Sequence, residues 1–249
     1  MRGSLVVVGT GPGKAELMTP ATQAALARAT DLVGYGPYLD RIPARGDQCR
    51  HASDNRVELD RARLALSLAA SGRQVAVVSG GDPGVFAMAA AVFEAVETGD
   101  PAWRSLDIRV EPGVTAMLAA AAEVGAPLGG DFCAISLSDN LKAWATVERR
   151  LKAAAEADFV IALYNPASKA RPHQLGQAFE LLRQLKAAET PVLFVRAAGT
   201  AEAEVVTTTL GAADPSRADM RTLVIVGAST TRQVGRWVYT PRSERGAPS

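Results

Sequence analysis

The chain has 249 residues, of which 48% are hydrophobic and 21% are charged, and its formal net charge is +1. A chain of this length fits one compact unit or two small lobes, and the apolar fraction is enough for a sizeable core. The near-neutral balance supplies no overall field for nucleic acid or an anionic membrane, so we expect neither as a partner.

The cysteine and histidine positions argue against a disulfide framework and against a metal site. Cys49 and Cys133 lie far apart in the sequence, which favours a reduced cytosolic pair. The sequence has no Cys-x-x-Cys, and His51 and His173 stand alone, so we expect no metal. Met1 leads directly into a strand without a signal peptide, and the longest apolar runs are only strand-length. The cytoplasm is therefore the expected location.

The first half of the chain alternates short apolar strands with helices. Leu5 to Val8 is a continuous apolar run rich in β-branched residues, which is typical of a buried parallel strand. Thr19 followed by Pro20 predicts a helix start, because a hydroxyl N-cap precedes proline at the first helical position. Asn55 with Glu58 resembles a capping box. The other strands expected here span 31–33, 75–78 and 106–110, and the helices span 19–29, 55–70, 85–96 and 115–123.

A second series of elements follows residues 125–130, where glycine and proline break any hydrophobic period. We therefore predict a first lobe of residues 1–125, a second lobe of residues 126–241 and a polar tail of residues 242–249. The alternation predicts mostly parallel sheets in both lobes, with a ligand cleft between them. The strands expected in the second lobe span 133–137, 159–163, 192–195, 204–209 and 223–226, and its helices span 142–155 and 174–187.

The first strand ends in a glycine-rich turn, GTGPG at residues 9–13, which invites a dinucleotide-binding interpretation. That fingerprint requires a third glycine at position 14, where a helix begins. Position 14 is Lys14, and the first helix signal comes only at Thr19. The dinucleotide interpretation therefore loses most of its support.

Two further strands end in similar turns, GGDPG at residues 80–84 and EPGVTA at residues 111–116. The carboxyl ends of parallel strands share one edge of a sheet, and glycine lets the backbone approach a ligand closely there. We expect backbone N–H and C=O groups to supply most of the hydrogen bonds to a ligand at this edge.

This ordered set of turns resembles the class III S-adenosylmethionine-dependent methyltransferases that act on tetrapyrroles. The resemblance runs from Leu5 to about Thr231 and includes YNP at 164–166, AGT at 198–200 and IVG at 225–227. It implies a two-lobed α/β fold with mostly parallel sheets and helices, the methyl donor in the cleft between the lobes, and a homodimer.

The resemblance also implies which residues contact S-adenosylmethionine and its product, S-adenosylhomocysteine. Much of that contact would come from backbone, so side-chain identity reports the shape of the site. Asp82 is expected to face the polar end of the donor, with a turn residue bonding its own backbone as the alternative. The implied donor-binding residues are Gly11, Pro12, Gly80, Gly81, Asp82, Val85, Thr115, Ala116, Tyr164, Asn165, Gly199 and Gly227.

Three segments resemble the ring-contracting branch of this family, which serves cobalamin (vitamin B12) biosynthesis. They are GYGPY at 34–38, LSD at 137–139 and the run from Tyr164 to Arg171. The branch implies methyl transfer to carbon 17 of precorrin-3B, with ring contraction giving precorrin-4, or the equivalent step on cobalt-factor III.

The implied substrate carries many carboxylates, for which the planar guanidinium of arginine is a two-pronged partner. We expect Lys169 and Arg171 to bind it, and Tyr35 and Tyr38 to stack on the macrocycle or to donate hydroxyl bonds. Further candidates lie in predicted loops or at helix starts: Arg41, Arg45, Arg50 and Arg56.

Ring contraction needs a proton removed from a hydroxyl group, so a general base is a further expectation. The candidates are His51, Asp54, Asp139 and His173, and imidazole is suited to the task near neutral pH. Each of the four has a structural or surface role as its alternative.

A class III methyltransferase that acts on a different tetrapyrrole is one alternative, and two other functions also stay open at this point. One is a methyltransferase of the same fold that acts on RNA or protein, which a basic patch would favour. The other is a tetrapyrrole carrier without activity, in which the turns serve structure only. Methyl transfer into a tetrapyrrole distinguishes the expected function from both.

Overall fold

The computed structural model describes residues 3–54 and 57–243, and the chain divides into two compact units. The first unit extends to Ala116 and the second begins at Met117, some residues before the boundary expected from the glycines and prolines. The helix α5 (Ala116–Val124) accounts for the difference, because all of it after Ala116 belongs to the second unit. The carboxylate of Glu123, near the end of α5, accepts the backbone N–H of Gly199 at 3.3 Å.

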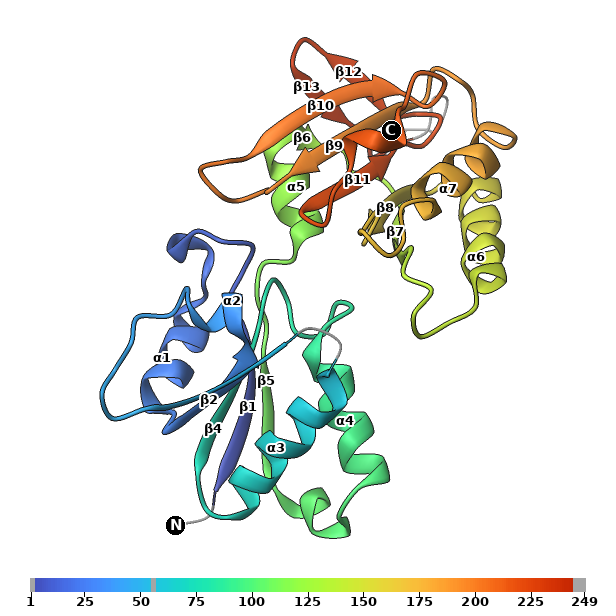
Figure 1. The fold of residues 1–249 in the computed structure, drawn as a ribbon. Coiled ribbons are helices and arrows are strands. Elements are labelled where there is room, and N and C mark those ends of the chain that lie inside the picture. Colours follow the sequence, from blue (N-terminus) through green and yellow to red (C-terminus); the bar gives the residue numbers. More distant parts are fainter. Residues whose placement is uncertain (1–2, 55–56, 244–249) are drawn as a thin grey trace. The chain divides into compact units, whose positions relative to one another are not determined.

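The first unit holds a five-stranded sheet in the order β3-β2-β4-β1-β5 (Figure 1). Each of its four pairings is parallel, as the alternation of strands and helices predicts. The elements of this unit are β1 (Ser4–Gly9), η1 (Ala15–Leu17), α1 (Pro20–Arg28), β2 (Asp31–Tyr35), α2 (Gly36–Leu39), β3 (Cys49–Ser53), α3 (Glu58–Ala70), β4 (Gln74–Ser79), α4 (Met88–Thr98), η2 (Pro101–Ser105) and β5 (Asp107–Glu111).

Successive residues of the central strands point to opposite faces of this sheet and meet different helices. Leu5 and Val7 of β1 pack with α3 and α4 in one core cluster. Val8 of β1 and Val78 of β4 pack on the other face with α1 and α2. Figure 1 shows these two helical layers on either side of the sheet. Because all five strands are parallel, their carboxyl ends share one edge, where the glycine-rich turns follow β1, β4 and β5.

Helix starts in this unit agree with the sequence in one case and differ in another. Thr19 caps α1 as predicted, since its hydroxyl accepts the backbone N–H of Thr22 at 3.2 Å. The helix predicted from Val85 begins only at Met88. Phe86 has a φ of +53°, which lies outside the helical region, so the chain cannot enter α4 earlier.

The capping residue predicted at Asn55 lies outside the described residues, and α3 begins at Glu58 with Val57 before it. Strand β3 was not predicted from the sequence. Its residues are exposed or half-buried, so it lacks the apolar run that marked the other strands.

The second unit holds a five-stranded sheet in the order β10-β9-β11-β8-β7 and a three-stranded sheet in the order β12-β13-β6. After α5, its elements are β6 (Gly125–Ala126), β7 (Phe132–Ser136), α6 (Trp144–Glu156), β8 (Val160–Tyr164), α7 (Gln174–Arg183), β9 (Pro191–Arg196), β10 (Glu204–Thr209), η3 (Pro215–Arg217), β11 (Thr222–Val226), β12 (Arg232–Val234) and β13 (Trp237–Tyr239).

The prediction of mostly parallel strands is wrong for this second sheet. Strands β7 and β8 pair in parallel, whereas β8 with β11, β11 with β9, and β9 with β10 are antiparallel. The reason is the connections: β9 and β10 are joined by residues 197–203, which are too few for a helical crossover and reverse the chain instead. Strand β11 then enters between β9 and β8 in the direction of β10.

Helices α6 and α7 pack on the second sheet through one continuous core. Val147 and Leu151 of α6 meet Phe179 of α7 over Leu163 of β8, and all four side chains are fully buried. The rings of Phe179 and Phe194 meet edge to face with centroids 6.0 Å apart. Figure 1 shows α6 and α7 together on one face of this sheet.

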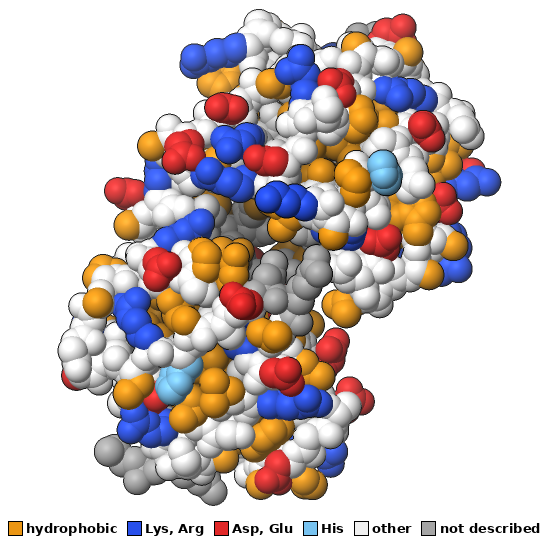
Figure 2. All heavy atoms as spheres, viewed as in Figure 1, with side chains coloured by type: hydrophobic (Ala, Val, Ile, Leu, Met, Phe, Trp, Pro, Cys, Tyr) orange, Lys and Arg blue, Asp and Glu red, His pale blue; other side chains and the backbone are white. Residues whose placement is uncertain are grey.

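The surface carries both signs of charge. Figure 2 shows Lys and Arg side chains interspersed with Asp and Glu over the face in view, in keeping with the net charge of +1. Within the described part of the chain, no helix is both long enough and apolar enough to span a membrane.

A buried carboxylate fastens the amino end of the first sheet. The side chain of Asp31, at the start of β2, is 2% exposed and accepts hydrogen bonds from Arg73 Nε and Thr30 Oγ1, each at 2.7 Å. His51 Nε2 lies 2.9 Å from its other oxygen. Burial by itself raises the pKa of Asp31, but the bonds from these three partners outweigh it and lower the pKa to about 2. The folded state therefore favours the ionised carboxylate.

We expect Asp31→Asn to lower the free energy of unfolding at neutral pH by about 2 kcal/mol, and the difference to shrink on acidification. A folded pKa of about 2, against an ordinary 3.8, gives stability that is present above the ordinary value and lost as pH falls toward 2. Urea denaturation of the wild type and Asp31→Asn between pH 7 and pH 2 measures this difference in unfolding free energy.

The matched control is Asp60→Asn, which removes an exposed partner of Arg63 on α3. It is expected to change the unfolding free energy by less than about 1 kcal/mol at any pH. A constant difference between Asp31→Asn and the wild type from neutral pH to pH 2 would contradict the prediction.

Candidate functional site

Two of the glycine-rich turns of the first unit are joined by their backbones. The N–H of Gly11 donates to the carbonyl of Gly81 at 3.2 Å, and the N–H of Gly81 donates to the carbonyl of Gly11 at 2.8 Å. Both residues have positive φ, +72° and +65°, which glycine adopts without a steric cost. This reciprocal bridge ties the turn after β1 to the turn after β4.

The third turn, after β5, packs against the same two backbones. A Cβ on Gly113 would lie 2.3 Å from the carbonyl oxygen of Gly81, and one on Gly9 would lie 2.7 Å from the nitrogen of Gly113. No side chain fits between the three turns, so they stack as bare backbone. The hydroxyl of Thr22 in α1 donates to the buried carbonyl of Gly9 at 3.1 Å. We call these three turns, residues 9–13, 80–84 and 111–113, the glycine stack.

Asp82 is a link within the glycine stack. Its carboxylate accepts the backbone N–H of Gly84 at 2.8 Å and that of Gly113 at 3.0 Å. The first bond closes its own turn, and the second ties that turn to the one after β5. The side chain therefore has the turn role that was its alternative interpretation, and contact with a ligand stays a prediction.

The remaining donor-binding candidates of this unit lie around the glycine stack. An added Cβ on Gly81 would meet nothing closer than the Cα of Thr115, at 3.8 Å, with the nitrogen of Ala116 next. There is thus room beside Gly81 for at least a methyl group. Pro12, in the first turn, and Val85, directly after the second turn, are half-buried.

Tyr38 packs directly on the glycine stack, with Tyr35 beside it. A Cβ on Gly80 would lie 2.7 Å from Cζ of Tyr38, so position 80 is glycine to admit this ring. The rings of Tyr35 and Tyr38 meet edge to face with centroids 5.4 Å apart. The structure therefore brings both predicted substrate-binding tyrosines to the turn that carries predicted donor-binding residues.

In the second unit, predicted site residues follow the carboxyl end of β8. Tyr164 ends this strand, and its hydroxyl accepts the backbone N–H of Met117 at 3.0 Å. Asn165 has a φ of +52°, which is uncommon for residues other than glycine, and its Nδ2 donates to the hydroxyl of Ser136 at 2.9 Å. The sequence analysis missed Ser136, although a hydroxyl at the end of the neighbouring strand β7 is a signal for it.

Gly199 and Gly227 lie at opposite edges of the second sheet. Gly199, with a φ of +70°, follows β9 at the edge where Tyr164 ends β8. Gly227 follows β11, which runs antiparallel to both strands, and its N–H donates to the carbonyl of Pro191 at the start of β9. The antiparallel pairing therefore separates Gly227 from the other candidates of this unit.

The four candidate bases have different surroundings. His51 is engaged with Asp31 at the amino end of the first sheet, whereas the glycine stack lies at the carboxyl end. Asp54 is exposed directly after β3. Asp139 accepts a side-chain amide N–H from the first residue of α7 at 3.1 Å, and His173 is exposed just before that helix.

The two cations expected to bind substrate lie in the loop between β8 and α7. Arg171 is half-buried and donates through Nη1 to the carbonyl of Asn165 at 3.3 Å, so part of its guanidinium supports the loop. Lys169 is exposed at the turn that joins Ser168 to Arg171.

The arginines of the first unit differ in how far protein groups occupy them. Arg45 pairs with a neighbouring aspartate, and Arg50 donates to three backbone carbonyls. Arg41 lies over the ring of Tyr38. Arg56 lies outside the described residues.

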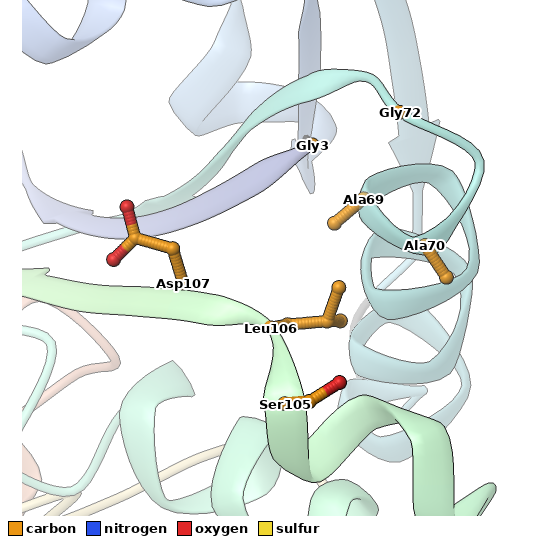
Figure 3. Close-up of a pocket in the computed structure, with 7 residues that line it drawn as sticks. All are labelled: Gly3, Ala69, Ala70, Gly72, Ser105, Leu106 and Asp107. Carbon is orange, nitrogen blue, oxygen red and sulfur yellow. The ribbon is translucent and has the colours of Figure 1, made fainter. Parts of the chain in front are cut away.

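A pocket of about 240 Å³ lies at the other edge of the first sheet, at the amino ends of β1 and β5 (Figure 3). Figure 3 shows one ionisable side chain among its labelled residues, Asp107, which pairs with Arg109 at 2.8 Å. We therefore place the candidate site at the glycine stack and not at this pocket. The lining residues are Gly3, Ala69, Ala70, Gly72, Ser105, Leu106 and Asp107.

We expect Asp82→Ala to lower the free energy of unfolding by about 1–3 kcal/mol, because two backbone N–H groups lose a charged acceptor. Asp82→Asn keeps one oxygen acceptor and is expected to lose less. Denaturant unfolding at neutral pH measures both. Asp100→Ala, which removes a single exposed N–H acceptor at the start of η2, is the matched control. A loss at Asp82→Ala no larger than that of the control would contradict the linking role.

Comparison with known proteins identifies relatives along the whole chain. The family model of the Tetrapyrrole (Corrin/Porphyrin) Methylases matches residues 4–214. A precorrin-3B C(17)-methyltransferase from Sinorhizobium sp. is 61% identical over 252 residues, which cover 99% of each protein.

Solved structures share the fold. The crystal structure of the methyltransferase CobJ has a TM-score of 0.94 and 56% identity, over 96% of this chain and 100% of that one. The uroporphyrin-III C-methyl transferase from Thermus thermophilus, complexed with S-adenyl homocysteine, has a TM-score of 0.68 and 23% identity, over 90% of this chain and 97% of that one. With the family model matching most of its length and its fold shared with these enzymes, the chain belongs to the tetrapyrrole methylase family.

Proposed function

We propose that this protein transfers a methyl group from S-adenosylmethionine to carbon 17 of precorrin-3B, with ring contraction giving precorrin-4 in cobalamin biosynthesis. The observation that carries the proposal is the 61% identity to a precorrin-3B C(17)-methyltransferase along 99% of both chains. Cobalt-factor III is the alternative substrate for the same step, and it is to be tested beside precorrin-3B.

The glycine stack fits the methyl donor. A bound S-adenosylmethionine supplies the electrophilic methyl group, carried on a sulfonium. The stack offers backbone rather than side chains, and the room beside Gly81 lets a ligand approach that backbone closely. We propose that Gly11, Pro12, Gly80, Gly81, Asp82, Val85, Thr115 and Ala116 bind it in the first unit, and Tyr164, Asn165 and Gly199 in the second.

For methyl transfer, these residues must chiefly align the donor with the substrate and exclude water from the site. Rigid backbone serves alignment, because the Gly11–Gly81 bridge and the two bonds to Asp82 leave the turns little freedom. Gly227 is left out of the proposed site, since it lies at the opposite edge of its sheet from Tyr164.

Ring contraction requires a residue that accepts a proton from the substrate hydroxyl. His51 is engaged with Asp31 at the other end of the first sheet, so we leave it out. Asp54, Asp139 and His173 remain the candidates, because each lies in a loop outside the sheets.

The family resemblance supports two further proposals. We propose that the protein forms a homodimer and works in the cytoplasm on a small-molecule tetrapyrrole. Lys169, Arg171, Tyr35 and Tyr38 are the proposed substrate-binding residues.

Incubation of the purified protein with S-adenosylmethionine and precorrin-3B tests the function. We expect a product that gains one methyl group and has altered conjugation, read by mass and by ultraviolet-visible spectrum. A parallel incubation with cobalt-factor III measures the alternative. Label transferred into RNA or protein and not into a tetrapyrrole, or no transfer at all, would overturn the proposal.

Pro12→Trp tests whether the first turn binds the donor. Pro12 is half-buried within the turn, so a large ring there is expected to weaken binding of S-adenosylhomocysteine at least about tenfold, a cost of about 1.4 kcal/mol. Isothermal calorimetry measures the affinity, and circular dichroism confirms folding. Lys14→Trp places the same ring on an exposed neighbour and is expected to bind normally. Normal affinity in folded Pro12→Trp would show that the turn is scaffold only.

A further inference from the structure

One cation of the first unit is presented beside the glycine stack on an aromatic platform. The guanidinium carbon of Arg41 lies 5.4 Å from the ring centroid of Tyr38, within the range of a cation–π interaction. Arg41 is exposed, and no described residue forms a hydrogen bond or ion pair with its guanidinium. Its donor groups are thus available to an external anion.

The platform itself is fixed to the proposed donor site. The ring of Tyr38 fills the place that a side chain at position 80 would take, 2.7 Å from an added Cβ, and the edge-to-face contact with Tyr35 restrains it from another side. Because Gly80 begins the turn that is bridged to Gly11, the position of Tyr38 is set by the glycine stack.

A second arginine holds the segment that carries this pair. Arg50 in β3 donates to the backbone carbonyls of Leu39, Ile42 and Pro43, each at 2.8 Å. These three carbonyls flank Arg41, so Arg50 closes the loop around it. The guanidinium of Arg50 is thus occupied by backbone carbonyls of the protein, whereas Arg41 is exposed to solvent.

Charge and geometry together indicate what Arg41 recognises. A planar guanidinium with free donors binds a carboxylate through two parallel hydrogen bonds, and stacking on an aromatic ring leaves its edges available for them. The proposed substrate carries carboxylates around its macrocycle.

We propose that Arg41 binds a carboxylate of the tetrapyrrole, with Tyr38 as its platform and Arg50 as a positioning residue that holds the loop. This proposal rests on the proposed function for its substrate. It adds to the second unit's Lys169 and Arg171 an anchor that belongs to the same unit as the glycine stack.

Steady-state kinetics of Arg41→Gln with precorrin-3B tests the proposal. We expect the KM for precorrin-3B to rise about tenfold, with kcat and the Kd for S-adenosylhomocysteine within about twofold of wild type. Arg41→Lys keeps the charge but loses the planar fork, so an intermediate KM is expected.

Arg63→Gln is the matched control, because it makes the same change of charge at an exposed position on α3. It is expected to leave the KM for precorrin-3B unchanged. An Arg41→Gln enzyme whose KM equals that of the control would overturn the proposal. So would an equal weakening of S-adenosylhomocysteine binding, because Arg41 would then act on the donor.

A binding measurement separates this proposal from the proposed function. Uroporphyrin III, a stable polycarboxylate tetrapyrrole, is titrated into wild type and Arg41→Gln and followed by its fluorescence. If the wild type fails to methylate precorrin-3B, the proposed function falls, but about tenfold weaker uroporphyrin binding by Arg41→Gln still supports the carboxylate anchor. Equal uroporphyrin binding by the two proteins would overturn the anchor whatever the activity.

Discussion

Direct contact between backbones is the constraint on which the first unit depends. Gly11 and Gly81 exchange two hydrogen bonds, and the gap between Gly113 and Gly81 is too small for a Cβ. Such an approach is available only to glycine, and it brings the ends of three parallel strands into one rigid group. Tyr38 packs on the outside of this group at Gly80. The stack therefore positions the proposed contacts at Gly11, Gly80, Gly81 and Tyr38.

In the second unit, side chains rather than bare backbone hold the candidate residues together. Its residues meet at a strand end through side chains: the Tyr164 hydroxyl accepts a backbone N–H from α5, and Asn165 reaches Ser136 on the neighbouring strand. Asn165 and Ala197 both follow strands with positive φ, a conformation that costs free energy and is concentrated at functional sites. Packing of the surrounding sheet holds them there.

In the proposed function, backbone groups bind the methyl donor and charged side chains bind the substrate. A donor held by backbone needs shape and close approach, which small residues provide. A substrate bearing carboxylates needs cations whose donors are free. Among the described residues of the first unit, protein groups accept hydrogen bonds from the guanidinium groups of Arg45 and Arg50, whereas that of Arg41 contacts only the ring of Tyr38. Arginines that are close together in the sequence therefore have different contacts.

The sequence by itself determined the family, four of the five strands of the first sheet and the glycine-rich turns that follow three of them. Its signals were local: apolar runs of strand length, a hydroxyl before proline at the start of α1, and glycines at the ends of strands.

The tertiary structure decided what depends on pairing between distant segments. Strand direction in the second sheet follows from how β9, β10 and β11 are connected, and that pairing moved Gly227 to the edge opposite Tyr164. His51 is a reasonable base from its chemistry, but a carboxylate twenty residues earlier engages it at the far end of the sheet. Likewise only the fold shows that Arg50 donates to three backbone carbonyls, whereas no described residue accepts a hydrogen bond from the Arg41 guanidinium. Periodicity reports which residues are buried, whereas the partner of a polar group depends on which distant segment packs against it.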